Sequence, residues 1–345
     1  MASTRTFAAP RDPAALVRRD AILRLAVGVT LAFTLSELLG WAPTFIAPVL
    51  FTVLATALPA APPLRTGLML VVVMAVVAGV AFVTPSLLRG APIVMVGVLG
   101  LLVFLAFVAT AQQRATLPAL LLLLCISTIP IVVMVAPAHG GLLPAAMVRS
   151  MAVAVVVLWL VFAVWPRTAP RPPSAAAPVE SPVKTALAGT VIVMPIMLVY
   201  LMFGLTDALP VLVTTVLLVV TFDIRQGAMQ GLAMMLGNLL GGLTGVIVYL
   251  LLGVAPSLLL LALLTFLTAT MFALRISQGG PAASVAVITS NSFLIILSSA
   301  IAAGADNSGI WLTRLFQFAL ACTFAVGMMV VIWGRRPSDS GQSPP

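Results

Sequence analysis

The sequence between Arg225 and Arg275 reads QGAMQGLAMMLGNLLGGLTGVIVYLLLGVAPSLLLLALLTFLTATMFAL over residues 226–274, without a single Asp, Glu, Lys, Arg or His. A helix of about 20 apolar residues crosses the hydrocarbon core of a bilayer, so this stretch has room for two such helices. Only helices and closed barrels can satisfy all of their backbone hydrogen bonds in lipid. The stretch therefore predicts an all-α protein that crosses the membrane more than once.

The composition of the whole chain agrees with this prediction. Hydrophobic residues make up 62% of the sequence and charged residues 7%, and the mean hydropathy is +1.24, whereas in a soluble domain the apolar fraction is about half. The net charge of +9 does not indicate nucleic acid, because the basic residues are scattered between apolar runs instead of forming one basic surface. We therefore expect the protein to contact the lipid bilayer rather than nucleic acid.

Pro, Gly and charged residues divide the chain into twelve predicted membrane helices. The second and eighth are short for a full crossing and have Pro48 and Pro210 in or beside them, so tilting, breaking or re-entry stays open for both. The predicted helices cover residues 23–39, 44–58, 67–84, 92–111, 117–136, 147–165, 186–204, 208–221, 230–252, 256–274, 282–303 and 312–333.

The basic residues predict the orientation of these helices. With twelve crossings and the N-terminus inside, all but three of the 17 Lys and Arg residues fall on the cytoplasmic side, as the positive-inside rule requires. The first helix follows five arginines, so we expect an uncleaved anchor with both termini in the cytoplasm of a bacterial inner membrane. The charged residues expected on the outer side are Glu37, Arg89, Arg149, Asp207, Asp306 and Arg314.

Four arginines in the first half of the chain recur in the same order in the second half. Each charge placed within the hydrocarbon of a bilayer costs about 2.5–3.5 kcal/mol, so such a recurrence is not background composition. Because six helices are an even number, the halves are expected to be parallel repeats related by an axis along the membrane normal. The predicted segments are an N-terminal tail (1–22), a first repeat (23–165), a Pro/Ala-rich cytoplasmic linker (166–184), a second repeat (185–334) and a disordered tail (335–345). The matched pairs are Arg65 with Arg225, Arg114 with Arg275, Arg149 with Arg314, and Arg167 with Arg335.

Two carboxylates and two arginines at the predicted outer ends are candidates for transport chemistry. Glu37 lies at the end of the first helix and Asp207 at the corresponding turn of the second half. A carboxylate near the interface can take up and release protons. Arg149 and Arg314 can grip a carboxylate with two parallel hydrogen bonds if they point between the repeats. The alternatives are solvated carboxylates at helix ends and arginines that reach outward to lipid headgroups.

Polar residues within the apolar runs are candidates for lining a substrate path. Ser127 and Thr128 precede Pro130, which frees a backbone carbonyl, and Ser290 and Asn291 stand at a similar distance after their leading arginine. Such groups also hold membrane helices together, and this alternative stays open. Asn238 lies beside the glycine repeat that predicts a closely packed helix face, formed by Gly237, Gly241 and Gly245.

The chain offers little that would predict a metal site, a cofactor or an enzyme. His139 stands alone in a loop, and Cys125 and Cys322 sit within apolar runs, where they are expected to behave as small hydrophobic residues. No phosphate-binding GxxxxGK[ST] motif is present and Lys184 is the only lysine. We therefore expect no cofactor, no metal and no catalysis, and a transporter of this kind would not be driven by nucleotide hydrolysis.

The succession of an arginine-led first helix, Gly-Trp-Ala-Pro at 40–43 and Leu64-Arg65 opening the third helix resembles the fusaric acid resistance and aromatic acid exporter superfamily. The second half repeats the order with Gly204, Asp207, Pro210 and Ile224 to Gly227. The resemblance implies an inner-membrane exporter of organic anions or aromatic acids that works with a periplasmic adaptor protein. Many members carry a large soluble domain, and the short linker here places this chain in a compact branch.

These patterns predict a secondary exporter of small organic anions, driven by the proton gradient. A passive anion channel is the first alternative, because paired arginines can also select anions in a pore. A membrane scaffold without transport activity is the second, with the glycine-rich face as its partner surface. Assembly of several copies is also left open by the sequence.

Overall fold

The computed structural model describes residues 13–58, 60–113, 116–137, 140–168, 181–203, 216, 224–303, 323 and 327. Within these ranges the protein is helical and no strand occurs. The helices are α1 (Pro13–Leu38), α2 (Ile46–Ala57), α3 (Leu64–Leu88), α4 (Pro92–Ala111), α5 (Thr116–Val135), α6 (Leu142–Val164), α7 (Pro182–Phe203), α9 (Ile224–Val254), α10 (Leu258–Ile276) and α11 (Gly280–Ala303).

Nine of the described helices, all except α2, are long and apolar enough to cross a membrane. Most of the predicted eighth and twelfth helices lies outside the described residues, as do the site candidates Asp207 and Arg314. The prediction of an all-α protein with many membrane helices is confirmed for the described part of the chain.

The outward faces of these helices carry apolar side chains in continuous stripes. Leu68, Met69, Val72 and Val76 on α3 are each more than half exposed, and α4, α9 and α10 show similar stripes. Exposed apolar surface of this extent is foreign to a soluble monomer, but it is the surface that lipid tails solvate. The stripes identify the faces of the bundle that contact the bilayer.

The short helix α2 still connects the two ends of the bundle. Its 12 residues span only about 18 Å at about 1.5 Å per residue. Before it, Ala42 accepts a hydrogen bond from Arg149 in the first turns of α6. After it, Pro62 accepts one from the indole of Trp159 near the far end of α6, at 2.9 Å. Between these two contacts the chain runs alongside α6 for about 15 Å, from the level of Arg149 to that of Trp159. We name the two ends of the bundle the Glu37 end and the Asp20 end, after the carboxylates of α1 that lie there.

Helices α1 and α6 begin earlier than hydropathy predicted, and so do α3, α7 and α9. Helix α1 starts at Pro13 rather than at residue 23, and α6 starts at Leu142 rather than at residue 147. Hydropathy marks where the apolar run begins, but the backbone hydrogen bonds of a helix can continue into polar sequence. As a result, part of the predicted N-terminal tail is helical, and Arg149 lies about two turns inside α6 instead of opening it.

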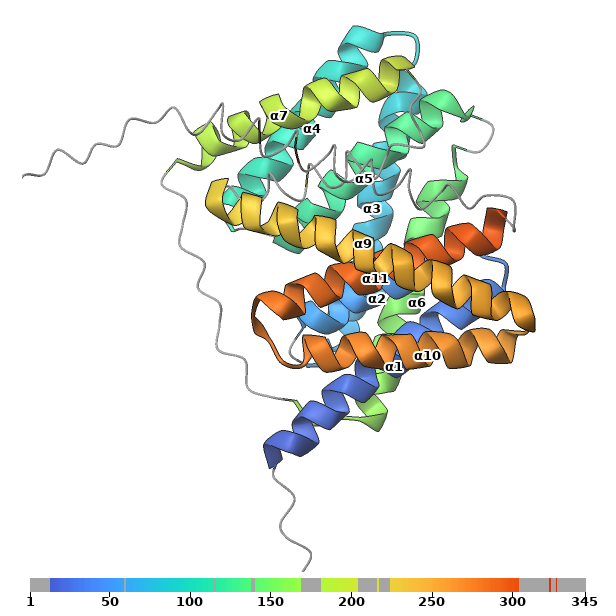
Figure 1. Cartoon of the computed structure of the whole chain (residues 1–345). Helices are drawn as coiled ribbons and strands as arrows, with labels where there is room; N and C mark the ends of the chain where they lie inside the picture. Colours follow the sequence, from blue (N-terminus) through green and yellow to red (C-terminus); the bar gives the residue numbers. More distant parts are fainter. Residues whose placement is uncertain are drawn as a thin grey trace, which may run out of the picture.

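Helices of the two halves contact one another in matching pairs. Within the halves, α3 contacts α5 and α9 contacts α11. Between the halves, α1 contacts α10 and α4 contacts α7, and these two pairs lie on opposite sides of the central α9–α11 pair in Figure 1. Each half therefore packs its first described helix on the fourth helix of the other half.

The α9–α11 contact is set by the predicted glycine face. A Cβ atom built at Gly237 would lie within 3.0 Å of the Ile288 side chain, and one built at Gly241 within 3.0 Å of the carbonyl oxygen of Thr289. At Gly245 the nearest atoms, on Ile296 and Phe293, are 3.1 to 3.2 Å away. The prediction of close helix packing is confirmed, and α11 of the same chain occupies this face.

We predict that Gly241→Ala destabilises the protein while Gly253→Ala does not. The new methyl group at Gly241 meets backbone atoms of α11, which cannot rotate away, and overpacking of this kind costs about 1–3 kcal/mol. Gly253 lies on the same helix with open space around it. Thermal unfolding in detergent micelles, followed by size-exclusion chromatography, measures the difference. Equal melting temperatures for the two variants would contradict the close α9–α11 contact.

Candidate functional site

The Glu37 end gathers polar side chains from three helices and one loop. We name this group the Glu37 cluster. Gly40 adopts a positive φ of +61°, a conformation that glycine tolerates best, and so turns the chain out of α1 into the loop of residues 39–45. The members of the cluster are Glu37 of α1, Trp41 and Thr44 of the loop, Arg149 of α6 and Ser298 of α11.

A chain of hydrogen bonds within the Glu37 cluster joins the two halves of the protein. The Thr44 hydroxyl donates to Oε1 of Glu37 at 2.6 Å and also lies 2.7 Å from the Ser298 hydroxyl. A hydroxyl carries a single hydrogen. When Thr44 donates to Glu37, Ser298 must therefore be the donor to Thr44. The bonds run from α11 of the second half to the carboxylate of α1 in the first.

Arg149 lies against the same loop and forms no ion pair with any residue that the structure describes. Its guanidinium carbon is 4.6 Å from the centre of the Trp41 ring, and one nitrogen donates to the carbonyl oxygen of Ala42 over a long 3.5 Å. No salt bridge joins Arg149 to Glu37, and the buried Nε atom of Arg149 has no hydrogen-bond partner in the described structure. The Arg149 side chain is half-buried against the loop, and its Nε atom keeps a donor that no described residue accepts.

Asn291 is a second polar residue with an unsatisfied group. It lies on α11 two turns before Ser298, so both residues fall on one side of that helix. Its buried Oδ1 atom has no hydrogen-bond partner in the described structure. An amide oxygen left without a partner in an apolar interior costs about 1–3 kcal/mol, which makes this position a natural contact for a polar ligand.

The other predicted polar residues are buried, and three of them bond to a carbonyl oxygen of their own helix. Ser127 and Thr128 on α5 both donate to the carbonyl oxygen of Leu124 at 2.9 Å. The Asn238 amide donates to Met234 of its own helix at 2.7 Å. Ser290 is buried on α11. Of these residues, Asn238 lies at the α9–α11 contact, where Ser292 donates to its carbonyl oxygen at 3.4 Å. No hydrogen bond among the described residues joins any of them to the Glu37 cluster.

The Asp20 end holds a second charged group, which the sequence did not single out. Asp20 is only 2% exposed, yet it lies 3.4 Å from a guanidinium nitrogen of Arg19 and 3.9 Å from one of Arg167. Arg24 donates to the carbonyl oxygens of Trp165 and Arg167 at 2.7 and 2.6 Å. We name Asp20, Arg19, Arg24 and Arg167 the Asp20 cluster.

The Asp20 cluster ties the start of α1 to the end of α6. The guanidinium of Arg24 also lies over the Phe162 ring, 4.5 Å from its centre, a contact worth about 0.5–2 kcal/mol. Nearly two turns before Arg24, Arg18 donates to the Ser277 hydroxyl at 3.1 Å, just after α10. The Asp20 end of α1 therefore contacts both halves, as its Glu37 end does.

No metal site with the usual ligands accompanies these clusters. Among the described residues, no group of three or more His, Cys, Asp or Glu side chains lies close enough together to hold an ion. What the two clusters can do is bind anions through arginine and carry a proton on a carboxylate.

We predict that Asp20 and Arg167 are energetically coupled. A double-mutant cycle of Asp20→Asn and Arg167→Gln, measured as unfolding free energies in mixed micelles, should give a coupling of about 0.5–3 kcal/mol, as for residues in direct contact. Arg89 follows the last residue of α3, at the Glu37 end, and provides the matched control. Asp20→Asn combined with Arg89→Gln should be additive within about 0.5 kcal/mol. Additive unfolding free energies in the Asp20–Arg167 cycle as well would show that these two residues do not stabilise each other.

Comparison with known proteins gives a family match, which lies in the first half of the chain. Residues 21–161 match the model of a family described as a protein of unknown function, DUF2955, and these residues begin in α1 and end in α6. No curated protein and no solved structure matches the chain. The chain is a multi-pass helical membrane protein whose first six helices are similar to the DUF2955 family.

Proposed function

We propose that the protein is a secondary transporter of the bacterial inner membrane that exports small organic anions in exchange for protons. The observation that carries this proposal is the hydrogen-bond chain from Ser298 through Thr44 to Glu37. It joins the two halves at the place where a protonatable carboxylate and an arginine with a free donor contact the same loop. A transporter needs such a junction, because its halves must move while cargo and proton exchange.

The matching helix contacts support the repeat arrangement that this mechanism needs. The α1–α10 contact has its counterpart in α4–α7, and the α3–α5 contact in α9–α11, as two parallel six-helix repeats would require. We extend this pattern to the twelve predicted helices. The excess of basic residues near the Asp20 end then faces the cytoplasm and the Glu37 end faces the periplasm.

Arg149 is the proposed anion-binding residue. Its free Nε atom and its terminal nitrogens form the two-pronged donor that fits a carboxylate. The Trp41 ring beside it is a surface on which an aromatic acid can stack. Asp207 and Arg314 are proposed to repeat the roles of Glu37 and Arg149 in the second half.

Proton coupling follows from the direction of the hydrogen-bond chain. An ionised Glu37 accepts from Thr44, whereas a protonated Glu37 can itself donate, and this reverses the hydroxyls of Thr44 and Ser298. The carboxylate also competes with an anionic cargo for the positive field of Arg149. Protonation of Glu37 from the periplasm therefore changes both the junction between the halves and the affinity for the anion.

The family resemblance adds the cargo class and a partner. It supports aromatic acids as cargo and a periplasmic adaptor as the component that receives them at the Glu37 end. Ser127, Thr128, Asn238, Ser290 and Asn291 are proposed to line the path to that end where their polar groups become free of the helix contacts.

We predict that Thr44→Val and Glu37→Gln abolish proton-driven flux, whereas Thr34→Val leaves it unchanged. Thr34 donates within α1 to the Thr30 carbonyl oxygen at 2.7 Å, so its replacement spares the junction. Proteoliposomes loaded with radiolabelled 4-hydroxybenzoate and given an imposed pH gradient measure the flux, with protein-free vesicles as the blank. Flux that ignores the gradient in the unaltered protein would remove the coupling, and single-channel currents far above transporter turnover would replace the exporter with an anion channel.

We predict that Arg149→Lys raises the half-saturating concentration of the same anion about tenfold. A lysine keeps the charge but loses the fork of donors, and a tenfold change corresponds to about 1.4 kcal/mol. Arg89→Lys is the matched control, since Arg89 is exposed at the end of α3 outside the Glu37 cluster. An unchanged half-saturating concentration in Arg149→Lys would exclude this arginine from the binding site.

A further inference from the structure

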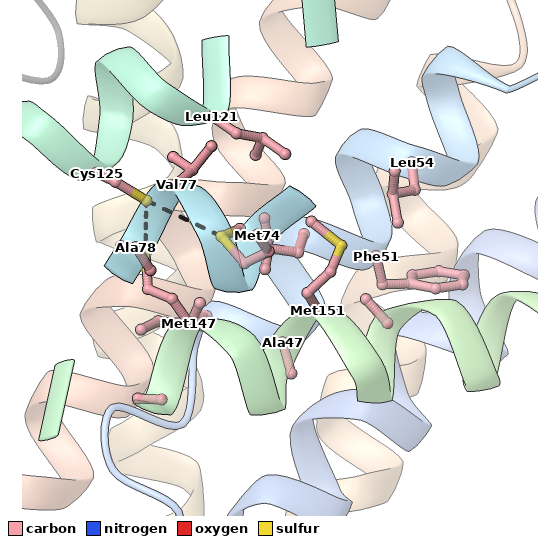
Figure 2. Packing of buried hydrophobic residues seen from close by; sticks show 14 of the residues in the cluster. Ala47, Phe51, Leu54, Met74, Val77, Ala78, Leu121, Cys125, Met147 and Met151 are labelled. Carbon is pink, nitrogen blue, oxygen red and sulfur yellow. Dashed lines mark hydrogen bonds between the residues drawn. The ribbon is translucent and has the colours of Figure 1, made fainter. Parts of the chain in front are cut away.

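The contact between α3, α5 and α6 contains four buried sulfur side chains. Cys125 of α5 lies with its Sγ atom 3.9 Å from Sδ of Met74 on α3 and 3.6 Å from Sδ of Met147 on α6. Cys125 and Met74 are fully buried and Met147 is 6% exposed. Met151, one turn further along α6, belongs to the same core, as Figure 2 shows. We name these four residues the sulfur cluster.

We propose that the sulfur cluster is a binding site for a monovalent soft cation, Cu(I) or its analogue Ag(I). Thiolate and thioether ligands select Cu(I) over harder ions. Three sulfurs that surround one ion in a plane at about 2.3 Å, the usual length of a zinc–sulfur bond, lie about 4.0 Å apart. The two separations from Cys125, 3.6 and 3.9 Å, are close to this value.

The charge of the site favours a monovalent ion over a divalent one. Binding replaces the thiol proton of Cys125, so that Cys–SH and Cu(I) give Cys–S–Cu(I) and one released proton. One thiolate and one monovalent cation sum to zero, and the thioethers of Met74 and Met147 add no charge. A divalent ion would leave a net positive charge in an apolar interior, where uncompensated charge is expensive. The site should therefore discriminate against Zn(II).

The equivalent contact in the second half shows that packing there does not use a thiol. Counted from the matched arginines Arg114 and Arg275, the position of Cys125 is taken by Ala286, which is buried on α11. The α9–α11 contact is filled by glycines against backbone instead. Among the described residues, the thiol of the sulfur cluster therefore has no counterpart in the second half.

The proposal of metal binding at the sulfur cluster does not rest on the proposed anion export. The sulfur cluster lies among α3, α5 and α6, and none of its members belongs to the Glu37 cluster. A bound ion would link three helices, so it should raise the melting temperature of the protein in proportion to its affinity.

The experiment uses the full chain, purified in detergent with Cys322 replaced by alanine in every sample. Ag(I) is added in the presence of a weak competing ligand, excess ion is removed, and bound silver is counted by mass spectrometry. We expect one ion per chain, a rise in melting temperature, and at least a tenfold loss of affinity in Cys125→Ala and in Met147→Leu. Met95→Leu is the control, because Met95 is a buried methionine of α4 outside the sulfur cluster, and it should bind as before.

The coordination itself is read from X-ray absorption of the Cu(I)-loaded protein, which should show only sulfur ligands, about 2.3 Å away. Equal silver content in Cys125→Ala and its parent would overturn the proposal, as would nitrogen or oxygen ligands around copper. Zn(II) bound as tightly as Ag(I) would overturn the argument from charge. The conservative Met147→Leu exchange keeps the side-chain volume, so its melting temperature without metal separates lost binding from lost folding.

Discussion

Polar groups within the bilayer must find their partners inside the chain, and this constraint organises the whole structure. Most hydroxyl groups meet it locally, by bonding to a carbonyl oxygen of their own helix, as Thr30, Thr52 and Thr110 do at 2.8 Å. Such a hydroxyl group already has its hydrogen-bond partner, so it has no need of a ligand. Thr44, Ser298, Arg149 and Asn291 are not satisfied within a helix in this way, and the proposed function uses them.

Helix α1 carries charged residues at both of its ends that bond to other parts of the chain. Its two carboxylates, Asp20 and Glu37, lie about 25 Å apart at about 1.5 Å per residue, one at each end of the bundle. At both ends it contacts both halves, through Arg24 and Arg18 at one end and through the Glu37 cluster at the other. Any motion of one half against the other must therefore break or remake contacts of α1, which makes this helix the natural element to couple a proton to a conformational change.

The sequence predicted the features that depend on local composition. Apolar runs located the helices, and the spacing of Gly237, Gly241 and Gly245 predicted a close contact whose partner proved to be α11. Arg149 and Glu37 were found because charges are scarce in this chain. Asp20 was missed because hydropathy placed it in a tail, although a lone carboxylate among arginines is a signal. Ser298 and Met147 had no local signal at all, since their partners Thr44 and Cys125 lie far away in the sequence and are brought close only by the packing of the helices.

The junction between the halves is tested most directly by cross-linking it. In a chain without Cys125 and Cys322, cysteines replacing Thr44 and Ser298 should be joined by a mild oxidant in native membranes. Anion flux should then stop and return on reduction, because the halves can no longer move apart at the Glu37 end. Failure of these two cysteines to cross-link would contradict the contact, and a cross-linked protein that transports at the full rate would contradict its role in transport.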